Sequence, residues 1–269
     1  MKERERSIAT VIFLAFLLLI ITISAYFAHT FLNQSQTINP SSSQLRAAIV
    51  DQLSLTFPNQ TFIQTATNIL KQAGYTVDYY PGERVTVEFY RNLPTYNYGL
   101  IILRVHSTTG GQPLIALFTS ETYSKSKYVY EQLTCKVCPV AYSTEEASIG
   151  IGYFGITPSF VESSMNGKFA NTIVIMMGCE GLHNTKMAEA FTEKGAKVYI
   201  SWSRAVLASH TDRATSRLLQ YLITKKETIK QGVNDVMKEV GADPAYESLL
   251  TYYPVKAGEQ KIQDTMSRP

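Results

Sequence analysis

The sequence lacks the features that would point to nucleic acids or nucleotides. It has no basic run with interleaved aromatic residues and no phosphate-binding loop of the Walker type. Its formal net charge is only +3 over 269 residues, which indicates no particular class of charged partner. Cysteine is scarce, with three residues in the chain. We therefore expect no nucleic-acid partner.

Charge is absent from one long stretch near the start of the chain. Residues 8–28 carry no charged side chain and consist mainly of Ile, Leu, Phe, Val and Ala. At about 1.5 Å per helical residue, they span roughly the 30 Å hydrocarbon core of a bilayer. A cleaved signal peptide is the alternative, but Tyr26 stands where its cleavage site would need a small residue. The stretch therefore predicts an uncleaved transmembrane signal anchor.

The basic residues around this stretch predict its orientation. Lys2, Arg4 and Arg6 precede it, and no Lys or Arg follows it until Arg46. We expect a cytoplasmic tail at residues 1–7, a membrane span at 8–28 and a polar linker at 29–43. Residues 44–269 would then form one domain outside the cytoplasm, on a single-pass membrane protein.

The pattern of apolar residues in this domain predicts an α/β fold with a mostly parallel sheet flanked by helices. Apolar runs at 98–105, 172–178 and 197–202 are typical of buried strands. Helical spacing is found at 60–72, 185–194, 214–223 and 229–240. Residues 85–89 fit either a strand or the start of a helix. Residues 123–148 are mixed in character, and we expect them to form an insertion that lines a pocket.

Two of the apolar runs end in reactive residues. His106 closes the first and Cys179 closes the second. Because the carboxyl ends of parallel strands meet at one edge of a sheet, the two side chains could share a site. A thiol near an imidazole is the minimum equipment for nucleophilic catalysis. The alternative is an inert core thiol and a strand-end histidine with a purely structural partner.

Motifs on both sides of Cys179 give this pair a family resemblance. They are Gly178-Cys179-Glu180-Gly181, a helix ending Phe191-x-x-x-Gly195-Ala196, a strand ending at Trp202, and Asp212-Arg213-Ala214-Thr215. In this order, and with the upstream strand ending at His106, they resemble CHAT domains and other caspase-like (clan CD) cysteine peptidases, including separases, gingipains and clostripain. The resemblance implies a caspase-like α/β domain, here preceded by one transmembrane helix.

The resemblance also implies a mechanism. Cys179 would be the nucleophile and His106 the general acid and base, with backbone N–H groups of Cys179 and Gly178 stabilising the oxyanion. The expected function is that of a membrane-anchored cysteine endopeptidase acting on peptides or proteins, without a metal or cofactor. The family usually has Gly directly after the histidine, whereas here Ser107 to Thr109 intervene. This difference favours the alternative, a catalytically inactive binding or scaffold domain.

Two acidic residues are candidates for substrate binding. Asp212 stands where some relatives keep an acid that receives Arg before the cleaved bond, which implies cleavage after basic residues. It could instead cap the helix that contains Ala214. Glu180 is either a second acid of this pocket or an ordinary charge at the start of a helix.

The remaining cysteines allow three interpretations. We expect Cys135 and Cys138 to form a small disulfide outside the cell, and free thiols are the next alternative. Together with Cys179 and His183 they would also make a Cys₃His zinc set. His183 and His210 are further candidates for residues near the cleft, but neither ends a strand.

Overall fold

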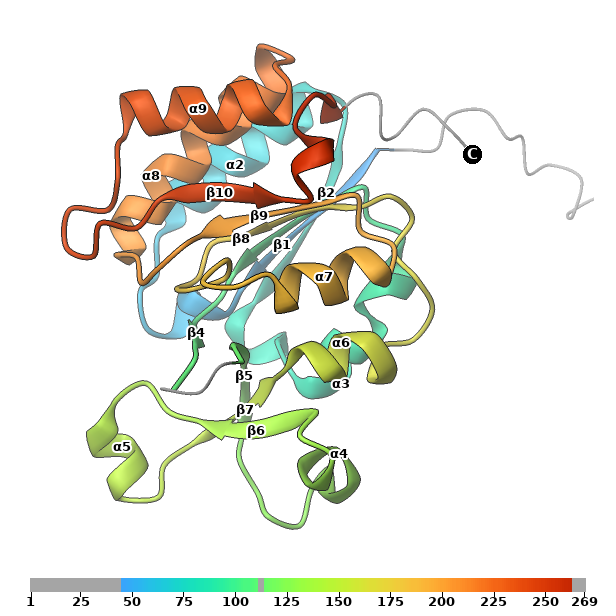
Figure 1. Ribbon diagram of the computed structural model, residues 1–269, viewed down its shortest axis with the longest axis vertical. Coiled ribbons are helices and arrows are strands. Elements are labelled where there is room, and N and C mark those ends of the chain that lie inside the picture. Colours follow the sequence, from blue (N-terminus) through green and yellow to red (C-terminus); the bar gives the residue numbers. More distant parts are fainter. Residues whose placement is uncertain (1–44, 111–113, 263–269) are drawn as a thin grey trace, which may run out of the picture. The chain divides into compact units, whose positions relative to one another are not determined.

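The computed structural model of the protein describes residues 45–110 and 114–262 (Figure 1). The chain divides into two units between Ser43 and Gln44, and the described residues all belong to the second unit. The expected tail at 1–7, span at 8–28 and linker at 29–43 lie outside the described residues. Within the described ranges, no helix combines the length and apolar character needed to cross a bilayer.

Six strands form the main sheet, in the order β10-β9-β8-β3-β1-β2. Five of them run parallel, and β10 at the edge is antiparallel to β9. The strands are β1 (Arg46–Asp51), β2 (Thr76–Pro81), β3 (Leu100–Arg104), β8 (Ile173–Met176), β9 (Val198–Trp202) and β10 (Leu250–Tyr253). All residues of β3, β8 and β9 are buried, as expected for a parallel sheet covered on both faces. The predicted α/β class with a mostly parallel sheet is confirmed.

Helices cover both faces of this sheet (Figure 1). One layer consists of α2 (Gln60–Gln72), α8 (Ala208–Leu219) and α9 (Ile229–Glu239), and the other of α3 (Val87–Asn92), α6 (Pro158–Ser164) and α7 (Lys186–Glu193). The alternation of side chains along β3 divides the core between them. Leu100 and Ile102 pack toward the first layer, whereas Ile101 and Leu103 pack toward the second.

A smaller antiparallel sheet follows the main sheet's β3. Its order is β4-β5-β7-β6, formed by β4 (Ser107–Thr108), β5 (Ala116–Thr122), β6 (Val137–Val140) and β7 (Tyr153–Ile156). Two short helices, α4 (Val129–Leu133) and α5 (Thr144–Ser148), lie beside β6 and contain no buried residue (Figure 1). Short 3-10 turns complete the described chain at η1 (Gln52–Leu55), η2 (Gly82–Arg84), η3 (Leu93–Tyr96) and η5 (Val255–Ala257), and a π-helical turn, η4 (Gln220–Thr224), extends α8.

One helix begins earlier than the sequence predicts, and one ambiguous stretch proves to be the start of a helix. α8 begins at Ala208, six residues before the predicted start, because its first turns make buried contacts of their own. There Thr211 Oγ1 accepts a hydrogen bond from the Trp202 indole at 2.9 Å. The ambiguous stretch 85–89 enters α3, which begins at Val87 and is capped by the Thr86 hydroxyl.

Candidate active site

The two strands that lead to His106 and Cys179 are neighbours in the main sheet. β3 and β8 pair in parallel register, with Leu103 opposite Met176. His106 follows the end of β3 by two residues, and Cys179 follows the end of β8 by three. The sheet thus brings both residues to its carboxyl edge, where open parallel sheets bind their ligands.

Hydrogen bonds join the two segments that leave these strands. Ser107 Oγ donates to the carbonyl oxygen of Cys179, and the Thr109 N–H donates to Glu180 Oε2 at 2.9 Å. Both donors come from the short stretch after His106 that departs from the family pattern. In this chain the stretch therefore ties the histidine segment to the cysteine segment.

Gly178 occupies a close approach between these segments. A Cβ atom built at this position would lie 2.4 Å from both the Val105 carbonyl oxygen and Ser107 Oγ, so only glycine fits. The Gly178 N–H donates to Met176 Sδ at 2.9 Å. Gly178 would have to release this contact to serve an oxyanion, and its expected role, like that of the Cys179 N–H, stays a prediction.

The imidazole of His106 is half-buried and held in place from several sides. Its Nε2 is hydrogen-bonded to Thr56 Oγ1 at 2.8 Å, and its backbone N–H donates to Gln52 Oε1 at 3.0 Å. The ring packs against the aromatic rings of Phe57, Phe118 and Tyr142. Burial, reinforced by the positive charge of Arg104, lowers the pKa of His106 to about 4. At neutral pH the ring is therefore uncharged, and one of its two nitrogens carries no proton.

The thiol of Cys179 lies in a different environment. It packs on the core beneath α2, α8 and α9, and its sulfur accepts a hydrogen bond from the Val206 N–H at 3.4 Å. Burial raises the pKa of Cys179, and the charges of Glu180 and Asp243 raise it further. Among the described residues, no hydrogen bond links this thiol to the His106 imidazole. At neutral pH Cys179 is a thiol that needs a base to become a nucleophile.

A buried ion network lies next to this pair. Arg104, with no exposed surface, forms a bidentate pair with Asp212 at 2.7 and 2.9 Å and donates to Asp51 Oδ1 at 2.7 Å. A further N–H of Arg104 donates to the Phe57 carbonyl oxygen at 2.8 Å. Phe57 and Thr56 follow η1, and both contact His106. By binding the Phe57 carbonyl, the ion network therefore fixes the short segment that positions the histidine.

Sequence reasoning missed Arg104, Asp51 and Thr56. A usable signal was present for the first of these, since Arg104 ends an otherwise apolar buried strand. A guanidinium at such a position requires carboxylate partners, because a buried charge without them is very costly. Nothing in the local sequence marks Asp51 as a partner of Arg104 or Thr56 as a partner of His106, because both come from another strand and its following turn.

Asp212 lies inside α8 rather than at its start. Leu207 is the N-cap residue, so the interpretation of Asp212 as a helix cap is wrong. The side chain is 6% exposed, and its two oxygens accept hydrogen bonds from Arg104 and from Asn59 Nδ2 at 2.8 Å. A substrate guanidinium could reach this carboxylate only after that internal pairing had opened. Glu180 has a backbone φ of +60°, and one of its carboxylate oxygens accepts a hydrogen bond from the Thr109 N–H.

The cysteines and the other histidines do not assemble with the candidate pair. Cys135 and Cys138 are free thiols, and no group of three or more metal-ligating side chains occurs in the described ranges. The disulfide is thus not formed in this structure, and the zinc set is not assembled. His183 is exposed, whereas His210 is buried against the Trp202 ring.

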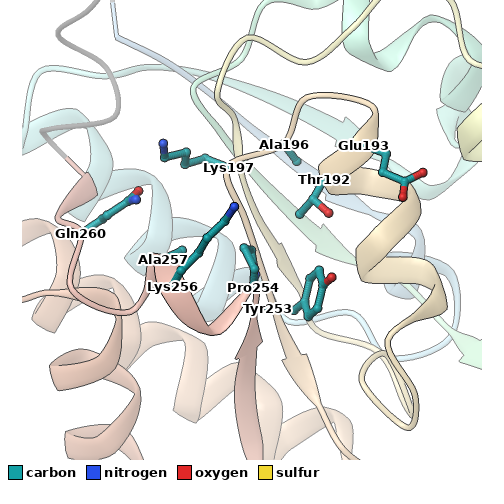
Figure 2. A pocket seen from close by; sticks show the side chains of 9 residues that line it. All are labelled: Thr192, Glu193, Ala196, Lys197, Tyr253, Pro254, Lys256, Ala257 and Gln260. Carbon is teal, nitrogen blue, oxygen red and sulfur yellow. The ribbon is translucent and has the colours of Figure 1, made fainter.

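A large groove opens beside the candidate site. It has a volume of about 1030 Å³ and is lined by Thr108 to Gly110 and by much of the stretch from Cys135 to Ala147 around β6, and we call it the β6 groove. The expectation that residues 123–148 line a pocket is confirmed. A smaller cavity of about 340 Å³ is lined by Lys197, before β9, and Tyr253, at the end of β10 (Figure 2). It lies at the amino edge of the parallel strands, away from Cys179.

Comparison with protein-family models and with curated proteins finds no match to this chain. The caspase-like resemblance therefore stays a prediction made from the sequence motifs.

Proposed function

We propose that this domain is a cysteine peptidase of the caspase-like type, with Cys179 as the nucleophile and His106 as the group that transfers protons. The observation that carries the proposal is the adjacency of β3 and β8, two parallel strands whose exits lead to these residues. The neutral imidazole and the ties between the two exit segments support it further.

In the proposed reaction, the Cys179 thiol turns from Val206 toward His106 and transfers its proton to the imidazole. The sulfur attacks the carbonyl carbon of a peptide bond and forms a tetrahedral oxyanion. The imidazolium then donates its proton to the leaving amine, and an acyl-enzyme remains on Cys179. His106 next takes a proton from water, the resulting hydroxide attacks the thioester, and the thiol is regenerated as the acid product leaves.

We also propose that residues 8–28 anchor the domain to a membrane and that residues 44–269 lie outside the cytoplasm. The uncharged stretch and the basic residues before it support this arrangement. The partners would then be a peptide or protein substrate and the membrane. Cleavage after basic residues is not part of the proposal, because Asp212 already pairs with Arg104.

A second candidate is a domain that binds peptides without cutting them. It is favoured by the pKa values of the pair, since a base with a pKa of about 4 draws a proton only weakly from a thiol whose pKa is raised. The Val206 contact, which points the sulfur into the core, favours it as well.

The deciding experiment measures peptide cleavage and thiol alkylation on the full-length protein. Wild type is compared with Cys179→Ala and His106→Ala, and with Ser163→Ala as the control, because Ser163 is exposed and does not line the groove beside the candidate site. A peptidase loses all cleavage in Cys179→Ala, loses roughly 10²- to 10⁴-fold in His106→Ala and keeps its rate in Ser163→Ala. If no peptide from a diverse library is cut and Cys179 alkylates no faster than a buried thiol, the peptidase proposal fails.

A further inference from the structure

The β6 groove has an unusual composition for a cavity of its size. Among the described residues that line it, none is Asp, Glu, Lys, Arg or His. Its walls are mostly apolar, with side chains such as Leu114, Val137, Val140 and Tyr142, and its polar groups are uncharged hydroxyls, thiols and an amide. A volume of about 1030 Å³ is at the upper end of the usual range for ligand pockets.

The groove is continuous with the candidate active site at two points. Tyr142 lines it and packs on the His106 ring, with the ring centroids 4.9 Å apart. Thr109 also lines it and binds Glu180, the residue after Cys179. A chain bound near His106 and Cys179 therefore has the groove next to it.

We propose that the β6 groove binds an uncharged, mainly apolar stretch of polypeptide beside the bond that Cys179 attacks. This inference rests on the proposed function and names the substrate class for it. It replaces the basic residue implied by the family resemblance with apolar residues such as leucine.

Electrostatics gives the physical reason. A Lys or Arg side chain in the groove would lose water and find no carboxylate on the described walls, which is costly for a charged group. Three acids near the groove and the candidate site already have partners, since Asp212 pairs with Arg104, Glu180 accepts the Thr109 N–H and Glu146 accepts the Tyr142 N–H. An apolar side chain gains free energy by leaving water for such walls. The groove thus selects peptides with apolar side chains over peptides with charged ones.

The first test measures binding to the full-length Cys179→Ala variant, which separates binding from cleavage. Two fluorescein-labelled alanine-based hexapeptides are compared by anisotropy, one with a central Leu-Leu pair and one with Lys-Lys. We expect the leucine peptide to bind at least about tenfold more tightly. Ala147→Trp, which fills part of the groove, should abolish this difference, whereas Ala242→Trp, an exposed alanine outside the groove, should preserve it.

A charge-gain variant and a thiol probe locate the site. Ala147→Glu supplies a carboxylate to the groove wall and should strengthen binding of the lysine peptide several-fold. Cys138 lines the groove and should alkylate more slowly when the leucine peptide is bound, with the rate followed by mass spectrometry. Burial raises the pKa of Cys138 to about 11, so the reaction is run at about pH 9.

The outcomes separate the two proposals. Tight binding of the leucine peptide with protection of Cys138, but no cleavage by the wild type, supports the groove and overturns the peptidase. Equal binding of the two peptides, or binding that leaves Cys138 unprotected and is insensitive to Ala147→Trp, overturns the groove inference even if the protein cuts peptides.

Discussion

Two regions border His106, and they differ in their charged side chains. On the side of β1, β3 and α8, Arg104 and two aspartates are buried together and satisfy one another. On the side of the small sheet, the β6 groove has no charged residue on its described walls and remains open. The comparison teaches that buried charge here belongs to the framework of the site, whereas ligand selection falls to an uncharged surface.

The largest expected effect comes from breaking the charged region. Arg104→Met leaves the carboxylates of Asp51 and Asp212 buried without their partner, and we expect it to lower the free energy of unfolding by about 3–5 kcal/mol. The measurement is urea denaturation. Lys238→Met is the matched control, because it removes an exposed pair with Asp235 and should cost less than about 1 kcal/mol.

A triple variant shows whether the cost arises from uncompensated charge. Asp51→Asn and Asp212→Asn added to Arg104→Met should recover a large part of the lost stability, since no buried charge then remains. An Arg104→Met variant as stable as the Lys238→Met control would contradict the interpretation of this region as a framework.

The large sheet could be predicted from the sequence because its strands are buried on both faces. Runs such as Leu100 to Val105 and Ile173 to Met177 have few alternatives to a central parallel strand. The small sheet was harder to predict. Its β6 is four residues long, contains Pro139 and is partly exposed, so neither length nor alternation distinguishes it from a loop.

The candidate site shows the same division. His106 and Cys179 could be found because each follows a recognisable strand. The polar partners of His106 could not, because Thr56 and Gln52 come from the turn after another strand, and only the sheet order brings β1 beside β3. The pairing of Asp212 with Arg104 is likewise a contact between residues far apart in the chain, which local patterns do not encode.

The second prediction concerns the pH dependence of stability. The pKa of His106 falls from 6.5 in the unfolded chain to about 4 in the fold, so the unfolded state binds more protons between these values. The stabilising contribution of His106 is fully present above pH 6.5 and is lost as the pH falls toward 4. The loss in the free energy of unfolding is at most about 3 kcal/mol, and it is smaller than this limit because the ring is only half-buried.

The difference between wild type and His106→Phe isolates this contribution. This comparison is needed because Asp51 changes the stability with pH in the opposite direction. Burial raises the pKa of Asp51, so its contribution to the free energy of unfolding falls as the pH rises through the acidic range, whereas that of His106 grows. Urea denaturation at a series of pH values should give a stability curve that is flatter for His106→Phe than for wild type between pH 6.5 and 4. The exposed His183→Gln should behave like wild type, and parallel curves for wild type and His106→Phe would refute the burial of a neutral His106.

The smallest effect tests whether the charged region reaches the histidine through Thr56. Thr56→Val removes the hydroxyl bonded to Nε2 and should cost about 1 kcal/mol, whereas Thr56→Ser keeps it. The specific readout is the ¹⁵N spectrum of the His106 ring, whose tautomer populations should change in Thr56→Val and not in Thr56→Ser. Because Arg104 holds the neighbouring Phe57 carbonyl, an Arg104→Lys variant that remains folded should alter the same ring signals. Unchanged signals in both variants would mean that the buried charges stabilise the fold without orienting His106, and the groove side, through Tyr142, would then be the region that positions the ring.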